Sequence, residues 1–136
     1  MRYVLDTNAV SALMKGVPAV VAKLRAASRG DAAIPHPVMA EIAYGIERLP
    51  HSKRREALRE RFDLIGTELS RAAWTDAVSE RFGWIKATLE RRGRRIEDFD
   101  AAIAAHALAA DAVLVTANLD DMTRVPGLTV EDWGKG

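Results

Sequence analysis

The chain has 136 residues, of which 49% are hydrophobic and 29% are charged; this is typical of one globular domain and too short for two. Its formal net charge of +1 does not by itself indicate a nucleic-acid partner, and the lack of cysteine excludes disulfides and thiolate metal sites. We therefore expect a single domain over residues 1–136, located in the cytoplasm, without a signal peptide or a membrane span.

The chain begins with a short apolar run, residues 1–5, that predicts a buried strand. The run stops at Asp6, Thr7 and Asn8, which favour a turn or a helix N-cap, and a helix is predicted over residues 9–14. Asp6 therefore lies where a buried strand ends. In open α/β sheets ligands bind outside these carboxyl ends, although a plain capping role explains the pattern equally well at this point.

Helices and a strand alternate in the next segment. After a break at a glycine and a proline, a helix is predicted over residues 19–27 and a short strand over residues 32–34. A third helix is predicted over residues 37–49. Glu41 lies inside this helix among apolar and small residues, so its carboxylate either extends toward solvent or is buried with a partner.

Two further helices are predicted in the middle of the chain. The first, over residues 52–62, is strongly basic with a thin apolar face, and a linker around Gly66 follows it. The second is a long helix from Ser70 to Arg92. Its apolar residues fall on one stripe, which predicts packing in the core or in a dimer: Trp74, Ala77, Val78, Phe82, Ile85 and Leu89.

The densest positive cluster of the chain comes next, and it consists of Arg91, Arg92, Arg94 and Arg95. An acidic segment follows directly at residues 97–100. We expect Asp98 at an N-cap or in a first helical turn, where it needs no other role. Asp100 begins an alanine-rich run over residues 101–110, so it would point into the interior near the start of a helix.

The last part of the chain returns to strands. His106 lies on a different helix face from Asp100, and we interpret it as structural or exposed instead of as a catalytic base. An apolar strand is predicted over residues 112–116, with polar and acidic residues following at 118–121, and a last strand over residues 128–130. The alternation of strands and helices predicts an α/β fold with a parallel sheet.

The acidic positions together predict a metal site. Strand ends converge on one edge of a parallel sheet, which would bring Asp6 close to the group at 118–121, with Glu41 and Asp100 on neighbouring helices. Gathered carboxylates raise each other's pKa, and a hard divalent cation relieves their repulsion. Such a site can activate a water and stabilise an in-line phosphoryl displacement. A zinc site of the usual kind is not expected, because cysteine is absent and the three histidines are scattered.

The ordered set of motifs resembles the PIN-domain ribonucleases of the VapC toxin type. The resemblance covers nearly the whole chain and is carried by residues 5–8, 39–45, 100–107, 115–118, 125–128 and 131–133. It implies a PIN-like three-layer α/β/α domain with a short central parallel sheet and surrounding helices. It also implies an endoribonuclease that depends on Mg²⁺ or Mn²⁺ and cuts structured RNA, usually in tRNA or rRNA loops.

The resemblance assigns catalytic and metal-binding roles to acidic residues. The family's first three acids fall on Asp6, Glu41 and Asp100. The fourth position falls on either Asn118 or Asp121. We favour Asp121, in direct or water-mediated contact with the metal, because Asn118 is uncharged and is a weaker ligand for a hard cation. Asn118 would then orient a water or a neighbouring carboxylate.

The resemblance also implies supporting residues and partners. Thr7 and Asn8 are expected to hold Asp6 by hydrogen bonds, and Thr116 and Asn118 are expected to support the site. Homodimers are usual in the family, as is a cognate antitoxin that blocks the active-site groove and binds operator DNA. The four clustered arginines are hypothesised to bind RNA, and the sequence leaves open whether they meet RNA or an acidic partner.

Other classes of protein fit the sequence less well. A receiver domain needs adjacent acids after its first strand, and a haloacid-dehalogenase-like phosphatase needs Asp-x-Asp there. The triplet of Asp6, Thr7 and Asn8 fits neither. The alternative is a non-catalytic PIN-like module that binds RNA or protein. Loss of the acids usually marks such a module, and here the acids are present.

Overall fold

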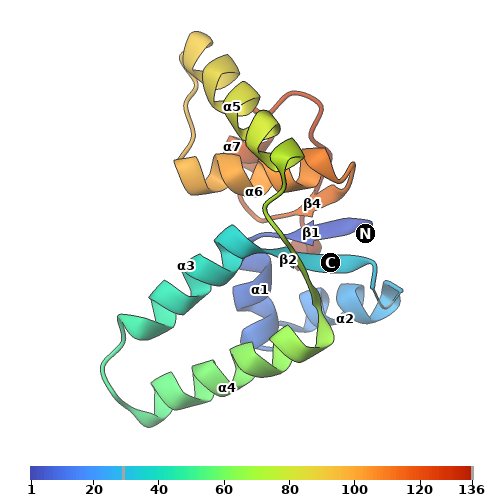
Figure 1. The fold of residues 1–136 in the computed structure, drawn as a ribbon. Helices are drawn as coiled ribbons and strands as arrows, with labels where there is room; N and C mark the ends of the chain where they lie inside the picture. Colours follow the sequence, from blue (N-terminus) through green and yellow to red (C-terminus); the bar gives the residue numbers. More distant parts are fainter. Residues whose placement is uncertain (29, 136) are drawn as a thin grey trace.

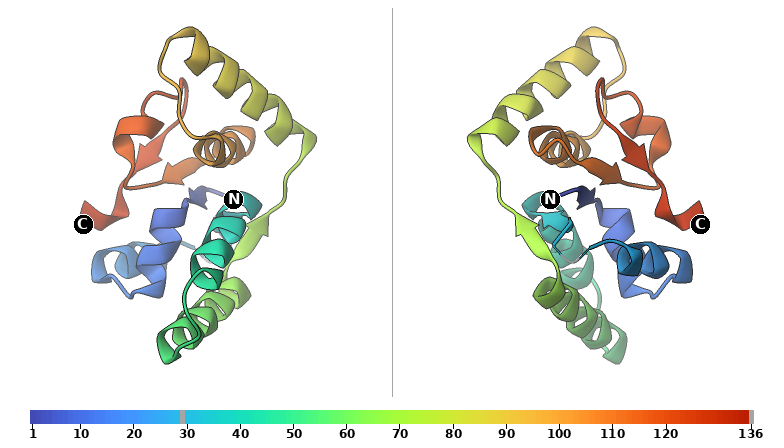
Figure 2. Two further views of the ribbon diagram at one scale, coloured as in Figure 1. Left: turned by 90° about the vertical axis from the view of Figure 1, so that its left-hand side faces the viewer. Right: turned by 90° about the vertical axis from the view of Figure 1, so that its right-hand side faces the viewer.

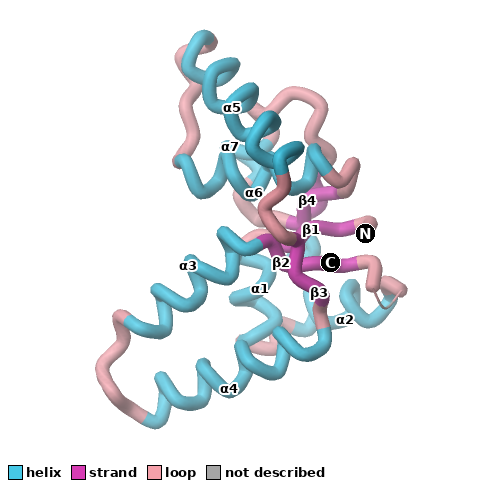
Figure 3. Tube along the Cα trace, viewed as in Figure 1, coloured by secondary structure: helices cyan, strands magenta, loops and turns pink. Residues whose placement is uncertain are grey.

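The computed structural model describes residues 1–28 and 30–135, which form one sheet with helices packed on both faces (Figures 1 and 3). The strands are β1 (Tyr3–Leu5), β2 (Ala32–Pro35), β3 (Ser70–Ala72), β4 (Val113–Val115) and β5 (Val130–Glu131). The helices are α1 (Thr7–Met14), α2 (Pro18–Ala26), α3 (His36–Glu47), α4 (Lys53–Glu68), α5 (Asp76–Arg91), α6 (Asp98–Ala109) and α7 (Leu119–Met122), with a final 3₁₀ turn η1 (Trp133–Lys135). No helix within the described ranges is long and apolar enough to cross a membrane.

The sheet is parallel throughout, with the strand order β3-β2-β1-β4-β5. Tyr3 of β1 pairs with Ala32 of β2 and with Val113 of β4, so the first strand of the chain lies at the centre. Because every strand runs in the same direction, all carboxyl ends meet at one edge. The predicted parallel α/β architecture is confirmed.

Three layers make up the molecule. Helices α1 to α4 lie on one side of the sheet, and α5 and α6 lie on the other (Figures 1 and 2). Helix α6 packs against β1, β4, α3 and α5. Its small side chains allow this close approach, and the buried positions are Ala101, Ala102, Ile103, Ala104, Ala105, His106 and Ala107.

Side-chain caps fix where several helices begin. Asp6 accepts a hydrogen bond from the Ala9 amide at 2.8 Å and so caps α1. Ser52 caps α4 in the same way, because its Oγ accepts from the Arg55 amide at 3.2 Å. Each cap satisfies an amide that has no partner within its own helix.

The predicted linker around Gly66 is wrong, because α4 continues through this residue to Glu68. Gly66 is buried, and its carbonyl accepts a hydrogen bond from Nη1 of Arg71 at 3.0 Å. A Cβ at residue 66 would meet Nη2 of Arg71 at 2.7 Å. The glycine therefore marks a close approach between α4 and β3 instead of a helix break.

The predicted helix start at Ser70 is also wrong. Residues Ser70–Ala72 form β3, which pairs with β2, and α5 begins only at Asp76. Trp74 thus lies outside the helix and is 46% exposed. Of the other stripe residues, Val78, Ile85 and Leu89 are buried as predicted, Phe82 is partly buried, and Ala77 is exposed. The three buried residues form the core face of α5 toward α6.

The central strands contribute fully buried side chains to the core, which yields the first prediction. Leu114 of β4 is fully buried, whereas Leu64 on α4 is 63% exposed. Replacing Leu114 with alanine removes the same atoms as Leu64→Ala but leaves a cavity. We expect Leu114→Ala to lower the free energy of unfolding by about 3 kcal/mol and Leu64→Ala by less than about 0.5 kcal/mol, measured by urea denaturation. Equal losses would contradict this assignment of the core.

Candidate active site

Four acidic residues reach the carboxyl edge of the sheet from four different elements. Asp6 follows β1 and caps α1, Asp100 lies in the first turn of α6, and Asp121 lies in α7, which follows β4. Glu41 lies within α3, the helix that follows β2 (Figure 2, left, viewed from the side of α3). The sequence placed these acids at one edge, and the structure brings them together there.

Asp100 is at the centre of this group. Partial burial, followed by the negative charges of Glu41, Asp121, Asp6 and Glu97, raises the pKa of Asp100 to about 6. Three of the four charges that act on it belong to the other acids of the predicted site. Asp100 is therefore the position at which their fields overlap.

Asp6 is the most deeply buried acid of the four, with 4% of its surface exposed. Burial raises the pKa of Asp6, and the charge of Glu41 adds to this rise. Hydrogen bonds from the Thr116 side chain and from the backbone amides of Ala9 and Asn8 act in the opposite direction. Thr116 and Asn8 thus support Asp6, the latter through its main chain.

Thr7 supports a different acid from the one expected. Its hydroxyl donates a hydrogen bond to Oε1 of Glu41 at 2.6 Å, so the prediction that Thr7 holds Asp6 is wrong. The contact forms because α1 packs against α3, a pairing that local sequence does not reveal. It fixes the Glu41 carboxylate beside the turn that carries Asp6.

Both carboxylate oxygens of Asp121 have donors. Nδ2 of Asn118 donates to Oδ2 at 3.2 Å, and Nη2 of Arg124 lies 3.5 Å from Oδ1. The main-chain N–H of Asn118 donates to Oγ1 of Thr116 at 2.9 Å. This bond joins Asn118 and Asp121 to the end of β4. The sequence had not singled out Arg124, which lies three residues after Asp121 in the turn that follows α7.

The acid cluster has the charge and chemistry to hold a hard divalent cation. Within the described ranges, Asp121 is paired with an arginine, whereas Asp6, Glu41 and Asp100 form no ion pair with Lys or Arg. No three acidic or histidine side chains in the described part of the chain are spaced as a ready-made metal cage.

A polar cleft borders the acids on the side of the arginine cluster. It is lined by Arg95, Ile96, Glu97, Asp98 and Asp121. One residue of the cluster, Arg95, thus shares a cleft wall with the fourth acid. At the other end of the cluster, Nη2 of Arg91 contacts Oγ1 of Thr88 on α5 at 3.4 Å.

An apolar groove leads to the acids from the opposite layer. It runs between α1, α3 and α4, and Thr7 and Glu41 stand on its wall. Its remaining lining is mostly apolar: Ser11, Met14, Lys15, Ile42, Gly45, Ile46 and Leu58. The groove offers an apolar approach that reaches the Glu41 carboxylate.

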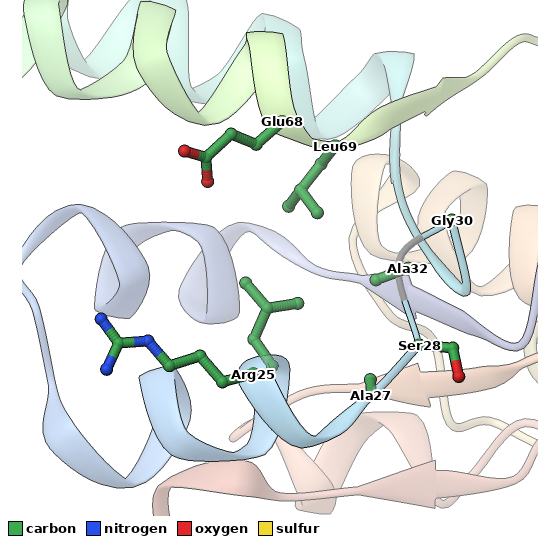
Figure 4. A pocket seen from close by; sticks show the side chains of 8 residues that line it. Arg25, Ala27, Ser28, Gly30, Ala32, Glu68 and Leu69 are labelled. Atoms are coloured by element: carbon green, nitrogen blue, oxygen red, sulfur yellow. The ribbon is translucent and has the colours of Figure 1, made fainter.

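A third cavity lies away from the acids (Figure 4). The last turns of α2 and α4 form it together with the start of β2, and the side chains of Arg25 and Glu68 line it. It is therefore at the amino end of β2. Ligands of α/β sheets bind at the opposite edge, so this cavity is not part of the candidate active site.

His106 has the structural place that the sequence predicted. It is 3% exposed, and the Trp74 ring meets it edge-on with 5.7 Å between ring centroids. Burial, with a contribution from the charge of His36, lowers the pKa of His106 to about 4. Its Nε2 has no hydrogen-bond partner among the described residues, and its neutral form packs between α5 and the sheet layer.

Comparison with known proteins places this geometry in a family. The model of the PIN domain matches residues 3–128. Ribonuclease VapC2 of Rickettsia felis is 32% identical, over 99% of this chain and all of that protein. The tRNA(fMet)-specific endonuclease VapC of Shigella flexneri is also 32% identical, over 98% of both chains. The chain belongs to the PIN-domain family, among the VapC ribonucleases.

Solved structures of VapC proteins agree with this assignment. VapBC2 from Rickettsia felis, bound to a DNA fragment from its promoter, matches with a TM-score of 0.88 at 30% identity, over 98% of this chain and 99% of that chain. DNA-bound VapBC from Salmonella typhimurium also matches with a TM-score of 0.88, at 27% identity over 98% of both chains. The PIN-like three-layer fold predicted from the sequence is confirmed.

The raised pKa of Asp100 yields a prediction about stability. Its folded-state pKa of about 6 lies above the ordinary value of 3.8, so its stabilising contribution is complete below pH 3.8 and is lost as pH rises through 6. We expect Asp100→Asn, in EDTA, to gain stability relative to the parent between pH 4.5 and pH 7.5, and to be at least as stable as the parent at pH 7.5. Urea denaturation at both pH values measures this difference.

The matched control is Asp98→Asn, which changes an exposed acid in the same helical turn that pairs with Lys86 at 3.1 Å. The free energy of unfolding of Asp98→Asn relative to the parent should not rise between pH 4.5 and pH 7.5 as it does for Asp100→Asn. If Asp100→Asn were less stable than the parent at both pH values by the same amount, Asp100 would be a structural residue.

Proposed function

We propose that this chain is the endoribonuclease toxin of a toxin–antitoxin pair and that it hydrolyses phosphodiester bonds in structured RNA with Mg²⁺ or Mn²⁺. The observation that carries the proposal is the convergence of Glu41, Asp121 and Asp6 on Asp100 at the carboxyl edge of the sheet. The Shigella flexneri relative is named a tRNA(fMet)-specific endonuclease, which makes a tRNA the first substrate to test. RNA loops in tRNA or rRNA are the substrate class.

Asp6, Glu41 and Asp100 are the residues that would hold the metal ion. Asp121 would contact it directly or through a water, with its carboxylate oriented by Asn118 and Arg124. When bound, a divalent ion lowers the pKa of a coordinated water and offsets charge on the scissile phosphate. The uncompensated charge of the three other acids supports this proposal.

The side chains of the site have separate tasks in the proposed reaction. Glu41, held by Thr7 at 2.6 Å, is a fixed acceptor for a proton of the attacking water. Asp100 lies where the charges of the other three acids act together, so it would share a bound cation with them. Asp6 is held at the end of β1 by amide donors from the start of α1, so its carboxylate has a fixed position.

The polar cleft provides the route for the RNA backbone. Arg95 and Asp121 share its lining, so a phosphate bound by Arg95 would lie beside the acid site. Arg94 is exposed next to it in the same loop. Phosphate contacts by arginines position a nucleic acid without reading its sequence, so the RNA preference of the enzyme must come from elsewhere on its surface.

A cognate antitoxin is the proposed protein partner. The VapBC and FitAB relatives of known structure are complexes of two kinds of chain, several of them with DNA. The apolar groove between α1, α3 and α4 reaches Thr7 and Glu41, so an apolar segment bound there would close the active site. Operator DNA would be contacted only through the antitoxin, and the toxin would work in the cytoplasm as a homodimer.

Metal-dependent cleavage is the central test. The purified chain, free of antitoxin, should cut tRNA in Mg²⁺ or Mn²⁺ and stop in EDTA, and Asp100→Asn should lower kcat by a factor of about 10³ or more. Gel analysis of end-labelled tRNA measures the rates, and Asp63→Asn, which changes an exposed acid on α4, is the matched control that should cut like the parent. Cleavage that continues at full rate in chelator would disprove the metal-dependent mechanism. Binding of tRNA without any cleavage would instead favour a non-catalytic PIN-like module.

The fourth acidic position can be tested by the metal requirement of the reaction. Asp121→Asn removes a negative charge from the site, whereas Asn118→Ala removes only one of the donors that orient it. We expect Asp121→Asn to raise the Mn²⁺ concentration needed for half-maximal activity by about tenfold, and more than Asn118→Ala does. Asp120→Asn, an exposed neighbour in α7, should leave this concentration unchanged. The reverse order of Asp121 and Asn118 would assign the fourth position to Asn118.

A further inference from the structure

Arg124 connects the fourth acid with the loop between α5 and α6. Its Nη2 lies 3.5 Å from Oδ1 of Asp121, and its Nη1 donates to the carbonyl oxygen of Arg95 at 3.2 Å. The second contact joins positions 29 residues apart in the sequence. One planar guanidinium group thus holds a carboxylate of the site and the backbone of the arginine cluster at the same time.

The placement of Arg124 separates it from residues that touch RNA. The polar cleft is lined by Arg95 and Asp121, and Arg124 is not part of its lining. The Nε of Arg124 is buried and has no partner in the part of the chain that the structure describes. The Arg124 side chain is 28% exposed, so most of it is covered by protein, and its polar contacts are with the two groups that it holds.

These contacts complete a continuous series of polar interactions across the site. From the loop it runs through Arg124 to Asp121, from there to Asn118, and through Thr116 to Asp6. The segment from Arg92 to Glu97 has no helix or strand of its own. The hydrogen bond from Arg124 to the Arg95 carbonyl therefore helps to fix the positions of Arg94 and Arg95 relative to the acids.

We propose that Arg124 is a positioning residue. It holds the loop that carries Arg94 and Arg95 at a fixed position relative to the acids of the site. This inference rests on the proposed function, since it assigns the phosphate contact to Arg94 and Arg95. The task requires a rigid fork with two donors pointing in different directions. A lysine has the same charge but a single point donor, so it cannot hold Asp121 and the Arg95 carbonyl together.

The first experiment compares Arg124→Lys and Arg124→Met in cleavage of tRNA with Mn²⁺. We expect both variants to lose about tenfold in kcat/KM, the lysine variant as much as the methionine variant, because geometry and not charge is lost. The control is Arg59→Met on α4, which removes an arginine with two long ion pairs of 4.0 Å, to Glu47 and Asp63. Parent-like activity of Arg124→Lys would overturn the proposal.

The second experiment measures the loop itself. Hydrogen exchange of the amides at 93–97 should be several-fold faster in both Arg124 variants than in the parent, and unchanged in Arg59→Met. This measurement needs no catalysis, so it tests the inference separately from the proposed function. If the parent cut no RNA but exchange at 93–97 were faster in the Arg124 variants, only the proposed function would be disproved. Unchanged exchange in Arg124→Lys and Arg124→Met would disprove the role of Arg124 in holding this loop.

A double-mutant cycle completes the test. In EDTA, the variant with Arg94→Ala and Arg95→Ala should bind tRNA more weakly and with a smaller salt dependence than the parent. Adding Arg124→Lys to that variant should lower affinity much less than it does in the parent, because the residues it positions are already gone. Full additivity would mean that Arg124 does not act through the loop. If the triple variant fails to fold by circular dichroism, the same cycle with Arg95→Ala alone decides between these outcomes.

Discussion

Mutual repulsion among carboxylates at the carboxyl edge of the sheet is the constraint on which the rest of this structure depends. The repulsion is clearest at Asp100, because burial and the charges of Glu41, Asp121 and Asp6 all raise its pKa. A folded protein keeps such a cluster only if the backbone holds the acids in place against their repulsion. The central strands and the helix starts that follow them provide that support.

Helix geometry offsets part of the repulsion. Asp6 is the N-cap of α1, and Asp100 and Asp121 lie in the first turns of α6 and α7, where unpaired amides and the helix dipole favour negative charge. Glu41 lies in the interior of α3 without this advantage and is held by the Thr7 hydroxyl instead. The four acids therefore do not have equal environments, which allows them separate roles in one reaction.

The same arrangement explains why the recognition of RNA and the chemistry can be coupled. Basic residues follow the C-terminus of α5, and Asp100 lies in the first turn of α6 only a few residues later, so under the proposed function one loop would serve both RNA binding and catalysis. Arg124 ties this loop to Asp121 from the other end of the chain. The apolar groove approaches from the opposite layer and ends at Glu41, so a protein inhibitor and the RNA backbone would reach the acids from different sides.

The sequence by itself determined the parallel α/β class and the placement of Asp6, Glu41 and Asp100, because apolar runs and helix caps are local signals. It also determined the close packing of α6, because alanine content can be read directly from the chain. Only the tertiary structure decided the strand at residues 70–72, whose residues have little strand propensity and take their form from pairing with β2. It likewise decided that α4 continues through Gly66, that Thr7 holds Glu41, and that Arg124 reaches the Arg95 carbonyl. The Thr7 and Arg124 contacts and the pairing of β3 join segments far apart in the chain, and no local pattern encodes which of them will meet.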